Sequence, residues 1–235
     1  MTDSHSAVHH GPELLHHFAD EEQQKNAASL GMWLFLGTEI MFFGGMFLAY
    51  LVYRLNYFNE FAAASRSIRI LPGAINTAVL LCSSLTVVLA VRAAQMGKRK
   101  LLIWMLILTL IFGLAFLVIK GVEWHEKYEE HHVPGNFMGR AFNVDDLKQD
   151  FPQLHVQSDH AQIFFSLYFA MTGIHALHMI VGVGIFLWLI YKAWKDDFSP
   201  KYYTPVEIAG LYWHFVDVVW IYLFPLLYLI DRKPL

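Results

Sequence analysis

The most informative scarcity in this sequence is that of charge. Only 16% of its 235 residues are Asp, Glu, Lys or Arg, whereas an ordinary globular domain carries about 25%. Cysteine is scarce as well, because Cys82 is the only one, so no disulfide can form within the chain and cysteine usage indicates no particular redox compartment. The formal net charge of −3 gives no basis for binding nucleic acid.

Long uncharged stretches take the place of a charged surface. Five of them are long enough to span a bilayer, and only the first and the last contain a charge, Glu39 and Asp217. A spanning helix needs about 20 mostly apolar residues. The sequence therefore predicts an all-α membrane protein, a bundle of five transmembrane helices over residues 26–53, 70–92, 101–122, 160–194 and 206–231.

Polar segments precede and interrupt this transmembrane region of residues 26–231. Residues 1–25 are polar and His-rich and lack the basic start and short apolar core of a signal peptide, so the first span is expected to be retained. A long polar loop outside the membrane is expected over residues 123–159. The loops around 92–100 and 191–201 are short and basic, and such loops favour the cytoplasm. This predicts a cytoplasmic N-terminus and a C-terminus outside.

The fourth uncharged stretch, residues 161–191, is longer than a membrane requires. As a helix it would measure about 46 Å, against a hydrocarbon core of about 30 Å. It should therefore tilt or project from the membrane. Its small residues Gly173, Gly182 and Gly184 should let another helix approach closely.

Polar side chains inside the spans are the candidate functional residues: Glu39, His175, His178, His214 and Asp217. Such groups are costly at membrane depth and mark a site, a relay or a structural pair. Because burial disfavours a charged carboxylate, we expect Glu39 to be largely neutral at pH 7. A structural pin between helices and a functional role both remain open for Glu39. Its candidate partner is His175 or His178.

The histidines allow several interpretations. His175 and His178 lie three residues apart on one helical face, which favours packing and hydrogen bonding over a metal site or haem ligation, since no further ligands accompany them. His214 and Asp217 also share a face, and they form either a local hydrogen bond or a proton relay. The histidines of the N-terminal segment and of the loop are irregularly spaced, so solvated segments are expected there.

Five segments together carry a family pattern. They are WLFLGTEIMFFGGMF (33–47), LPGAINTAVLLCSSLTVVLA (71–90), VIKGVEWHEK (118–127), TGIHALHMIVG (172–182) and YWHFVDVVWIYLFPLLYLI (212–230). In this order they resemble subunit III of the haem–copper oxidases, most closely the bacterial cytochrome c oxidase form. The chain looks like the five-helix form of that subunit. The resemblance then implies that the V-shaped lipid cleft of seven-helix members is open or filled by another subunit.

The resemblance also implies a role. It points to a non-redox accessory subunit III of an aa3-type cytochrome c oxidase, in a bacterial plasma membrane, that stabilises the catalytic subunit and supports proton uptake and access of lipid and oxygen. Enzymatic activity would belong to the complex, whose haem and copper are expected in partner subunits. The implied partners are subunits I and II and membrane lipids, with a larger respiratory supercomplex as a further candidate, and bound phospholipid is expected.

Individual residues acquire expectations from the same resemblance. Glu39 occupies the position of the family's carbodiimide-reactive Glu, and a carbodiimide attacks a protonated acid. Lys120 stands where many members carry Gln. No catalytic or metal-binding residue is expected in this chain. Candidate lipid-binding or structural residues lie in the matching segments: Glu123, Trp124, Trp213 and Trp220.

Two alternatives keep other functions open. One is subunit III of a quinol oxidase or an accessory protein of a nitric oxide reductase, and a copper-binding subunit II in the purified complex would argue against it. The other is an independent proton-conducting or haem-binding membrane protein, which a Soret band on the isolated chain would favour. The lack of internal repeats and of a convergent ligand set argues against this second alternative.

Overall fold

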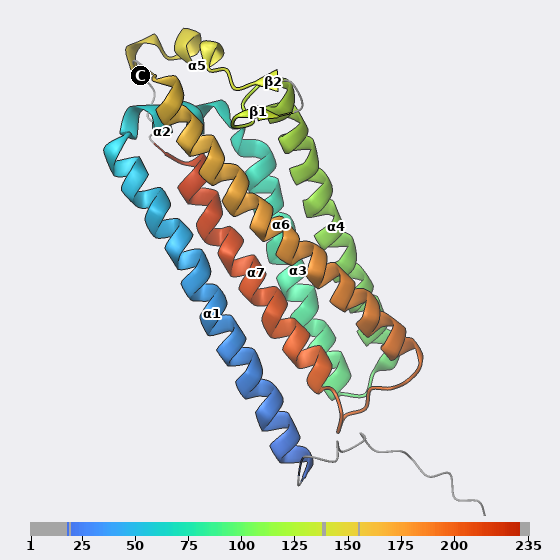
Figure 1. Ribbon diagram of the computed structural model, residues 1–235. Coiled ribbons are helices and arrows are strands. Elements are labelled where there is room, and N and C mark those ends of the chain that lie inside the picture. Colours follow the sequence, from blue (N-terminus) through green and yellow to red (C-terminus); the bar gives the residue numbers. More distant parts are fainter. Residues whose placement is uncertain (1–17, 19, 138–139, 155, 231–235) are drawn as a thin grey trace, which may run out of the picture.

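Five long helices run alongside one another in the computed structural model, which describes residues 18, 20–137, 140–154 and 156–230 (Figure 1). All five are long and apolar enough to cross a membrane, so the predicted all-α bundle is confirmed. The elements in chain order are α1 (Glu21–Asn56), α2 (Phe58–Ser67), α3 (Ile70–Gln95), α4 (Arg99–Glu129), β1 (Asn136–Phe137), β2 (Arg140–Ala141), α5 (Asp145–Asp150), the 3-10 helix η1 (Pro152–Leu154), α6 (Ser158–Trp194) and α7 (Thr204–Tyr228).

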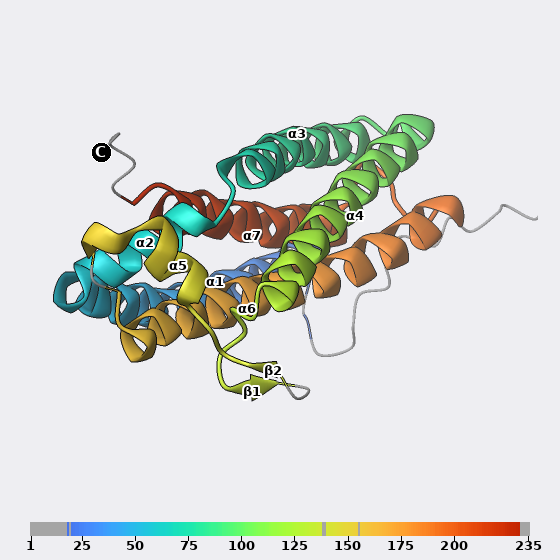
Figure 2. The ribbon, with the colours of Figure 1, turned by 90° about the horizontal axis from the view of Figure 1, so that it is seen from above.

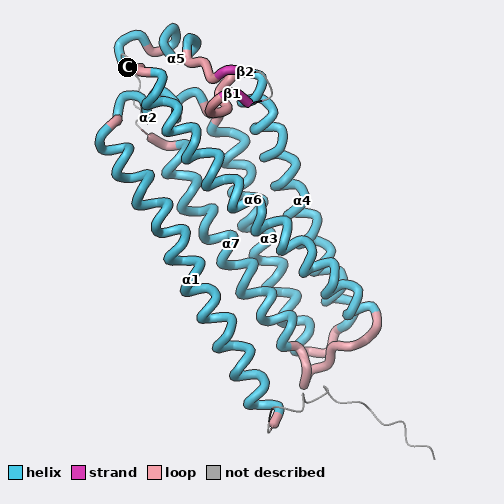
Figure 3. Tube along the Cα trace, viewed as in Figure 1, coloured by secondary structure: helices cyan, strands magenta, loops and turns pink. Residues whose placement is uncertain are grey.

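The connections gather at two ends of the bundle (Figure 3). The amino end contains the start of α1, the tight turn between α3 and α4, and the connection between α6 and α7. The turn closes because Gly97 adopts a positive φ of 66° while the Lys98 N–H donates to the Ala93 carbonyl at 2.9 Å, the pattern of a glycine-terminated helix. The loop end contains α2, α5, the two-stranded β1–β2 hairpin and the end of α7.

Helix α7 lies at the centre of the bundle. It contacts α1, α3 and α6, while α4 packs against α3 and α6 (Figure 2). Helix α1 contacts α2, α6 and α7 and has the smallest buried share of the five long helices. Helix α6 crosses the bundle obliquely (Figure 1).

Trp213 of α7 fixes the distance between the central helices. The side chain is fully buried and its Nε1–H donates to Ser83 Oγ on α3 at 2.8 Å. A Cβ at Gly113 of α4 would lie 2.8 Å from this indole, and one at Gly182 of α6 would lie 2.6 Å from it. The expected close approach of a helix is therefore found at Gly182. At Gly184, by contrast, an added Cβ would have no described atom within 4 Å.

Helix α2 is an element that the sequence analysis missed. It ties down the carboxyl end of α7, whose last carbonyl groups have no partner within the helix. Ser65 Oγ donates to the Leu227 carbonyl at 2.8 Å, and Tyr50 of α1 donates through its hydroxyl to the Leu226 carbonyl at 2.5 Å. Ser65 and the preceding residues 61–64 are completely buried, although this short segment has no long apolar run.

Two predicted helix boundaries were wrong, because charged residues were assumed to lie outside the helices. Helix α1 begins at Glu21 because Asp20 caps it, accepting from the Gln23 N–H at 2.6 Å. Helix α4 continues to Glu129, so the start of the expected polar loop (123–159) is helical. Of its charged residues there, Glu123 and Lys127 are buried, and each is paired with an oppositely charged side chain.

Candidate functional site

Glu39 of α1 faces α6, the helix that carries its two candidate partners, His175 and His178. Its Oε2 lies 3.2 Å from Nε2 of His178, with 20% and 15% of the two side chains exposed. The pairing with His178 is thus confirmed as a contact. Glu39 Oε2 completes no well-aligned hydrogen bond with any described residue, whereas His178 Nδ1 lies 2.9 Å from the Ile174 carbonyl. The contact joins the peripheral helix α1 to the centre of the bundle.

A second polar cluster, around Lys120 of α4, was not predicted as a site. Lys120 is almost completely buried, and its Nζ donates to Glu123 Oε1 at 2.8 Å, to the Tyr168 hydroxyl at 3.0 Å and to the Tyr228 hydroxyl at 2.6 Å. Both hydroxyls also donate to Glu123 Oε1, from Tyr228 at 2.6 Å. We call Lys120, Glu123, Tyr168 and Tyr228 the lysine cluster. It joins α4, α6 and α7 through charge-assisted hydrogen bonds.

Aromatic rings enclose the ammonium group of this cluster. Lys120 Nζ lies 4.6 Å from the ring centroid of Tyr168, 5.3 Å from that of Tyr228 and 5.4 Å from that of Trp220, distances at which cation–π attraction operates. The sequence held one signal for this cluster: Lys and Glu lie three residues apart in VIKGVE, a spacing that allows an ion pair on one helical face. Glu123 therefore acts as the counter-ion of a buried lysine, and Trp220 covers that pair while its Nε1–H donates to Thr77 at 3.1 Å.

Several buried polar groups have no hydrogen-bond partner among the described residues. The atoms without a hydrogen bond to any described residue include both side-chain atoms of Asn76, both ring nitrogens of His175, both carboxyl oxygens of Asp217, Glu123 Oε2 and Trp124 Nε1. His175 packs between aromatic rings instead, 5.4 Å from Phe116 and 5.3 Å from Trp220 between centroids. Such groups are rare in folded proteins, and each calls for an explanation such as ordered water.

His214 does not bond to Asp217. Its Nδ1 lies 2.7 Å from Ser84 Oγ on α3, while neither oxygen of Asp217 bonds to a described residue. The local hydrogen bond weighed in the sequence analysis is thus wrong. Helix α3 packs against α7 and brings Ser84 within hydrogen-bonding distance of His214, so this imidazole bonds across helices and not to an acid of its own helix.

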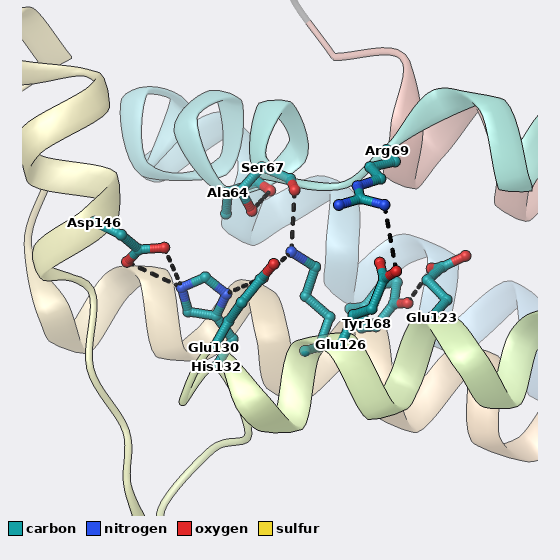
Figure 4. Close-up of polar contacts among 10 residues, drawn as sticks. Ala64, Ser67, Arg69, Glu123, Glu126, Glu130, His132, Asp146 and Tyr168 are labelled. Carbon is teal, nitrogen blue, oxygen red and sulfur yellow. Dashed lines mark hydrogen bonds and ion pairs between the residues drawn. The ribbon is translucent and has the colours of Figure 1, made fainter.

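Outside the membrane, His132 joins the loop to the bundle (Figure 4). The side chain is fully buried, its Nδ1 lies 3.2 Å from Glu130 and its Nε2 lies 3.1 Å from Asp146 of α5, and its ring stacks on Phe165. The expectation of a solvated loop histidine is wrong here, because two carboxylates and a ring enclose it. Partial burial would raise the pKa of Glu130, but His132 and the Lys127 ammonium outweigh it and lower that pKa to about 2.

The end of α4 also holds the connection between α2 and α3 (Figure 4). Lys127 Nζ donates to the Ser67 carbonyl at 3.0 Å and pairs with Glu130, and Arg69 pairs with Glu126 at 3.3 Å. Together with His132 these residues link α2, α4 and α5 at the loop end. The N-terminal histidines named as a solvated group lie within 1–17, outside the described residues.

No group of three or more His, Cys, Asp or Glu residues that could hold a metal ion occurs in the described part of the chain.

Two grooves open near the amino end of the bundle. One of about 580 Å³ lies between α1, α6 and α7 and includes Lys25, Trp188 and Lys201. The other, of about 410 Å³, lies between α3 and α7 and reaches His214.

Comparison with known proteins agrees with this architecture. The family model described as cytochrome c oxidase subunit III matches residues 16–143 and 153–231. The cytochrome c oxidase subunit 3 of Corynebacterium diphtheriae is 29% identical over 208 residues, covering 88% of this chain and 89% of that protein. The probable subunit 3 of Nocardia farcinica is 28% identical over 205 residues, covering 87% and 89%. The Gallus gallus subunit 3 is 29% identical over 204 residues, covering 84% and 67%. The chain therefore belongs to the cytochrome c oxidase subunit III family of the haem–copper oxidases, membrane proteins that are subunits of a multi-subunit oxidoreductase complex.

Proposed function

We propose that this chain is the non-redox subunit III of an aa3-type cytochrome c oxidase in a bacterial plasma membrane. It stabilises the catalytic subunit I, with subunit II as a further neighbour, and supports proton uptake and the access of lipid and oxygen. The observation that carries the proposal is the family match over nearly the whole chain, together with bacterial relatives of similar length.

The arrangement of the helices supports a structural role in a larger assembly. Large apolar side chains of α1 are well exposed, for example Leu30 at 71%, Leu34 at 70% and Met41 at 80%. Exposed apolar surface of this extent marks contact with lipid or with a partner protein. The interior, by contrast, is filled by aromatic side chains and by the lysine cluster, which rigidify the bundle.

The distribution of basic residues supports a cytoplasmic amino end. The turn after α3 and the connection after α6 are both at that end (Figure 1), and they carry Lys98, Lys195 and Lys201 in short segments. Short basic loops stay in the cytoplasm. The loop end, with the Glu130–His132–Asp146 contacts, then faces outward.

The groove between α1, α6 and α7 suits a phospholipid. Its polar part combines Lys25 and Lys201, which would attract a phosphate group, with Glu21 and Glu22, which would attract the amine of a zwitterionic headgroup. Its apolar part includes Met32, Ile185 and Ile208 along the path of an acyl chain. Trp188 belongs to the same groove, and tryptophan favours the membrane–water boundary. A bound lipid here would hold α1 against the bundle.

Affinity purification from native membranes tests the proposed function. The tagged chain, extracted in a mild detergent, should bring down a haem a-containing subunit I and a copper-binding subunit II. A strain without this chain should assemble an oxidase that starts at near-normal activity and loses it faster during turnover. Control purifications should use the same tag on an unrelated membrane protein.

Two other outcomes would replace the proposal. A complex that lacks the copper-binding subunit and oxidises quinol, or one that reduces nitric oxide, would assign the chain to a different member of the superfamily. A chain that purifies alone with a Soret band would make it an independent haem protein. Partner chains identified by mass spectrometry and an optical spectrum distinguish these cases.

A further inference from the structure

The groove between α3 and α7 is polar at its mouth and leads toward a buried acid. Its volume is about 410 Å³, room for roughly a dozen water molecules at about 30 Å³ each. Arg92 and Gln95 of α3 and Glu207 of α7 belong to its lining near the amino end, and His214 is its deepest residue along α7. Val88 and Val91 of α3 and Leu211 of α7 line it as well, so the groove has apolar walls, and its polar side chains lie at the mouth and at the inner end.

The residues of α7 that line the groove point toward Asp217. Glu207, Gly210 and His214 lie three or four residues apart, so they form one stripe along the helix, and Asp217 is the next residue of that stripe. Since α7 begins at Thr204, the rise of 1.5 Å per residue puts His214 about 15 Å and Asp217 about 20 Å along the helix. The stripe therefore descends from the membrane surface toward its middle.

Asp217 is a buried acid whose hydrogen-bonding capacity is unmet by the described residues. Only 2% of it is exposed, and neither carboxyl oxygen has a hydrogen-bond partner among the described residues. A buried carboxyl group without a partner is strongly disfavoured, whether charged or neutral. Ser84 of α3 approaches Asp217 without a well-aligned hydrogen bond to it, and its Oγ lies 2.7 Å from Nδ1 of His214, so three polar side chains meet at the inner end of the groove. They offer the two to four partners that a buried water requires.

We propose that the α3–α7 groove is a water-filled inlet, open at the amino end, that hydrates Asp217 and lets its carboxyl group exchange protons with that side of the membrane. The Ser84–His214 pair forms the narrow point of the inlet. Water beyond this pair completes the hydrogen bonding of Asp217. The inlet does not depend on the proposed partner subunits, because all its residues belong to this chain.

Charged and titratable groups near the inlet and deeper in the bundle come from all five long helices. Facing groups along it are Arg92 at the mouth on α3, and Glu207 and His214 on α7 itself. Lys25 of α1 pairs with Glu207 at 3.7 Å. Deeper in the bundle, His175 of α6 and Lys120 of α4 both contact the ring of Trp220, and Lys120 is already paired with Glu123.

Cysteine accessibility in native membranes tests the inlet at two depths. Thiolates react with charged methanethiosulfonate reagents in water and form poorly in lipid. In a Cys82→Ala background, Leu211→Cys in the groove is compared with Leu89→Cys, which faces outward on α3 with 41% exposure. His214→Cys is compared with Leu85→Cys, 61% exposed and adjacent to Ser84, at the same depth. The cysteine in the groove should react at least ~10-fold faster than the control cysteine on the outer face of α3. This difference should occur only when the reagent is added on the side of the membrane where the amino end lies.

The remaining outcomes decide against the inlet. Equal rates within both pairs would overturn it, and slow reaction at all four positions would mean that an acyl chain fills the groove. Leu211→Cys leaves Ser84, His214 and Asp217 intact and decides the question if His214→Cys fails to assemble. A third pair, Asp217→Cys against Leu81→Cys, tests the inner end. Labelling that stops at His214 would refute the hydration of Asp217.

Discussion

Replacing Gly182 with alanine should destabilise the bundle far more than the same change two residues later. The new Cβ would lie 2.6 Å from Cζ3 and 2.9 Å from Cε3 of Trp213, whereas carbon atoms in contact prefer about 3.5–4.0 Å. One of the two groups must therefore move by about 1 Å.

Trp213 cannot move away at low cost. Its ring also lies close to Gly113 of α4, where an added Cβ would be 2.8 Å from Cη2, and its Nε1–H is held by Ser83. Overpacking of a tight core costs about 1–3 kcal/mol, and the clamped indole argues for the upper part of that range. Gly184→Ala is the matched control, because its Cβ would meet no described atom within 4 Å and alanine gains up to about 1 kcal/mol in helix propensity.

Equilibrium unfolding of the purified chain in mixed micelles, with a rising fraction of sodium dodecyl sulfate, measures both variants. Far-ultraviolet circular dichroism follows the helices and tryptophan fluorescence follows the core. Because both alanines gain the same helix propensity, the two variants should differ by the overpacking cost alone, about 2–3 kcal/mol. Equal unfolding midpoints would show that Trp213 is not clamped between α4 and α6.

Three further predictions concern the polar groups. Lys120→Met leaves the carboxylate of Glu123 buried without its cation and should cost about 3–5 kcal/mol in the same assay, with much of this loss removed when Glu123 is also made apolar; an additive double variant would contradict the pairing. Glu39→Gln and His178→Ala should show a coupling energy of about 0.6 kcal/mol, as for hydrogen bonds between membrane helices, and fully additive effects would contradict their contact. Because the pKa of Glu130 is lowered to about 2 from 4.5, its stabilising contribution is complete above pH 4.5 and is lost as the pH falls toward about 2. Hydrogen exchange of the segments 131–137 and 140–154, corrected for intrinsic rates, should speed up over that range in the wild type, and Glu130→Gln should already be fast at pH 7 and lack this dependence.

The limits of sequence reasoning are clearest at the lysine cluster and at α2. Charge ended the predicted third span at 122, yet α4 continues to Glu129, because Lys120, Glu123 and Lys127 are buried with partners. Helix α2 forms because Ser65 caps the end of α7, a partner more than 160 positions away in the chain. Neither long-range pairing has a local pattern.

Glu39 and His214 show how similar guesses fared differently. Both belonged to proposed acid–imidazole pairs. The pair of Glu39 with His178 was found, between α1 and α6, at 3.2 Å. The pair of His214 with Asp217 was not found, because His214 bonds to Ser84 instead. Sharing a helical face brings two side chains near each other, but it does not decide which of them faces a better partner on the next helix.

The sequence by itself determined that the chain crosses a membrane five times as helices, since long uncharged runs cannot satisfy their backbone groups in lipid any other way. It also determined the family, through motifs distributed over all five spans. The tertiary structure decided which polar groups meet, which glycines accommodate Trp213, and which acid remains without a partner. These depend on the rotation and depth of each helix against its neighbours, and packing among all the helices sets both.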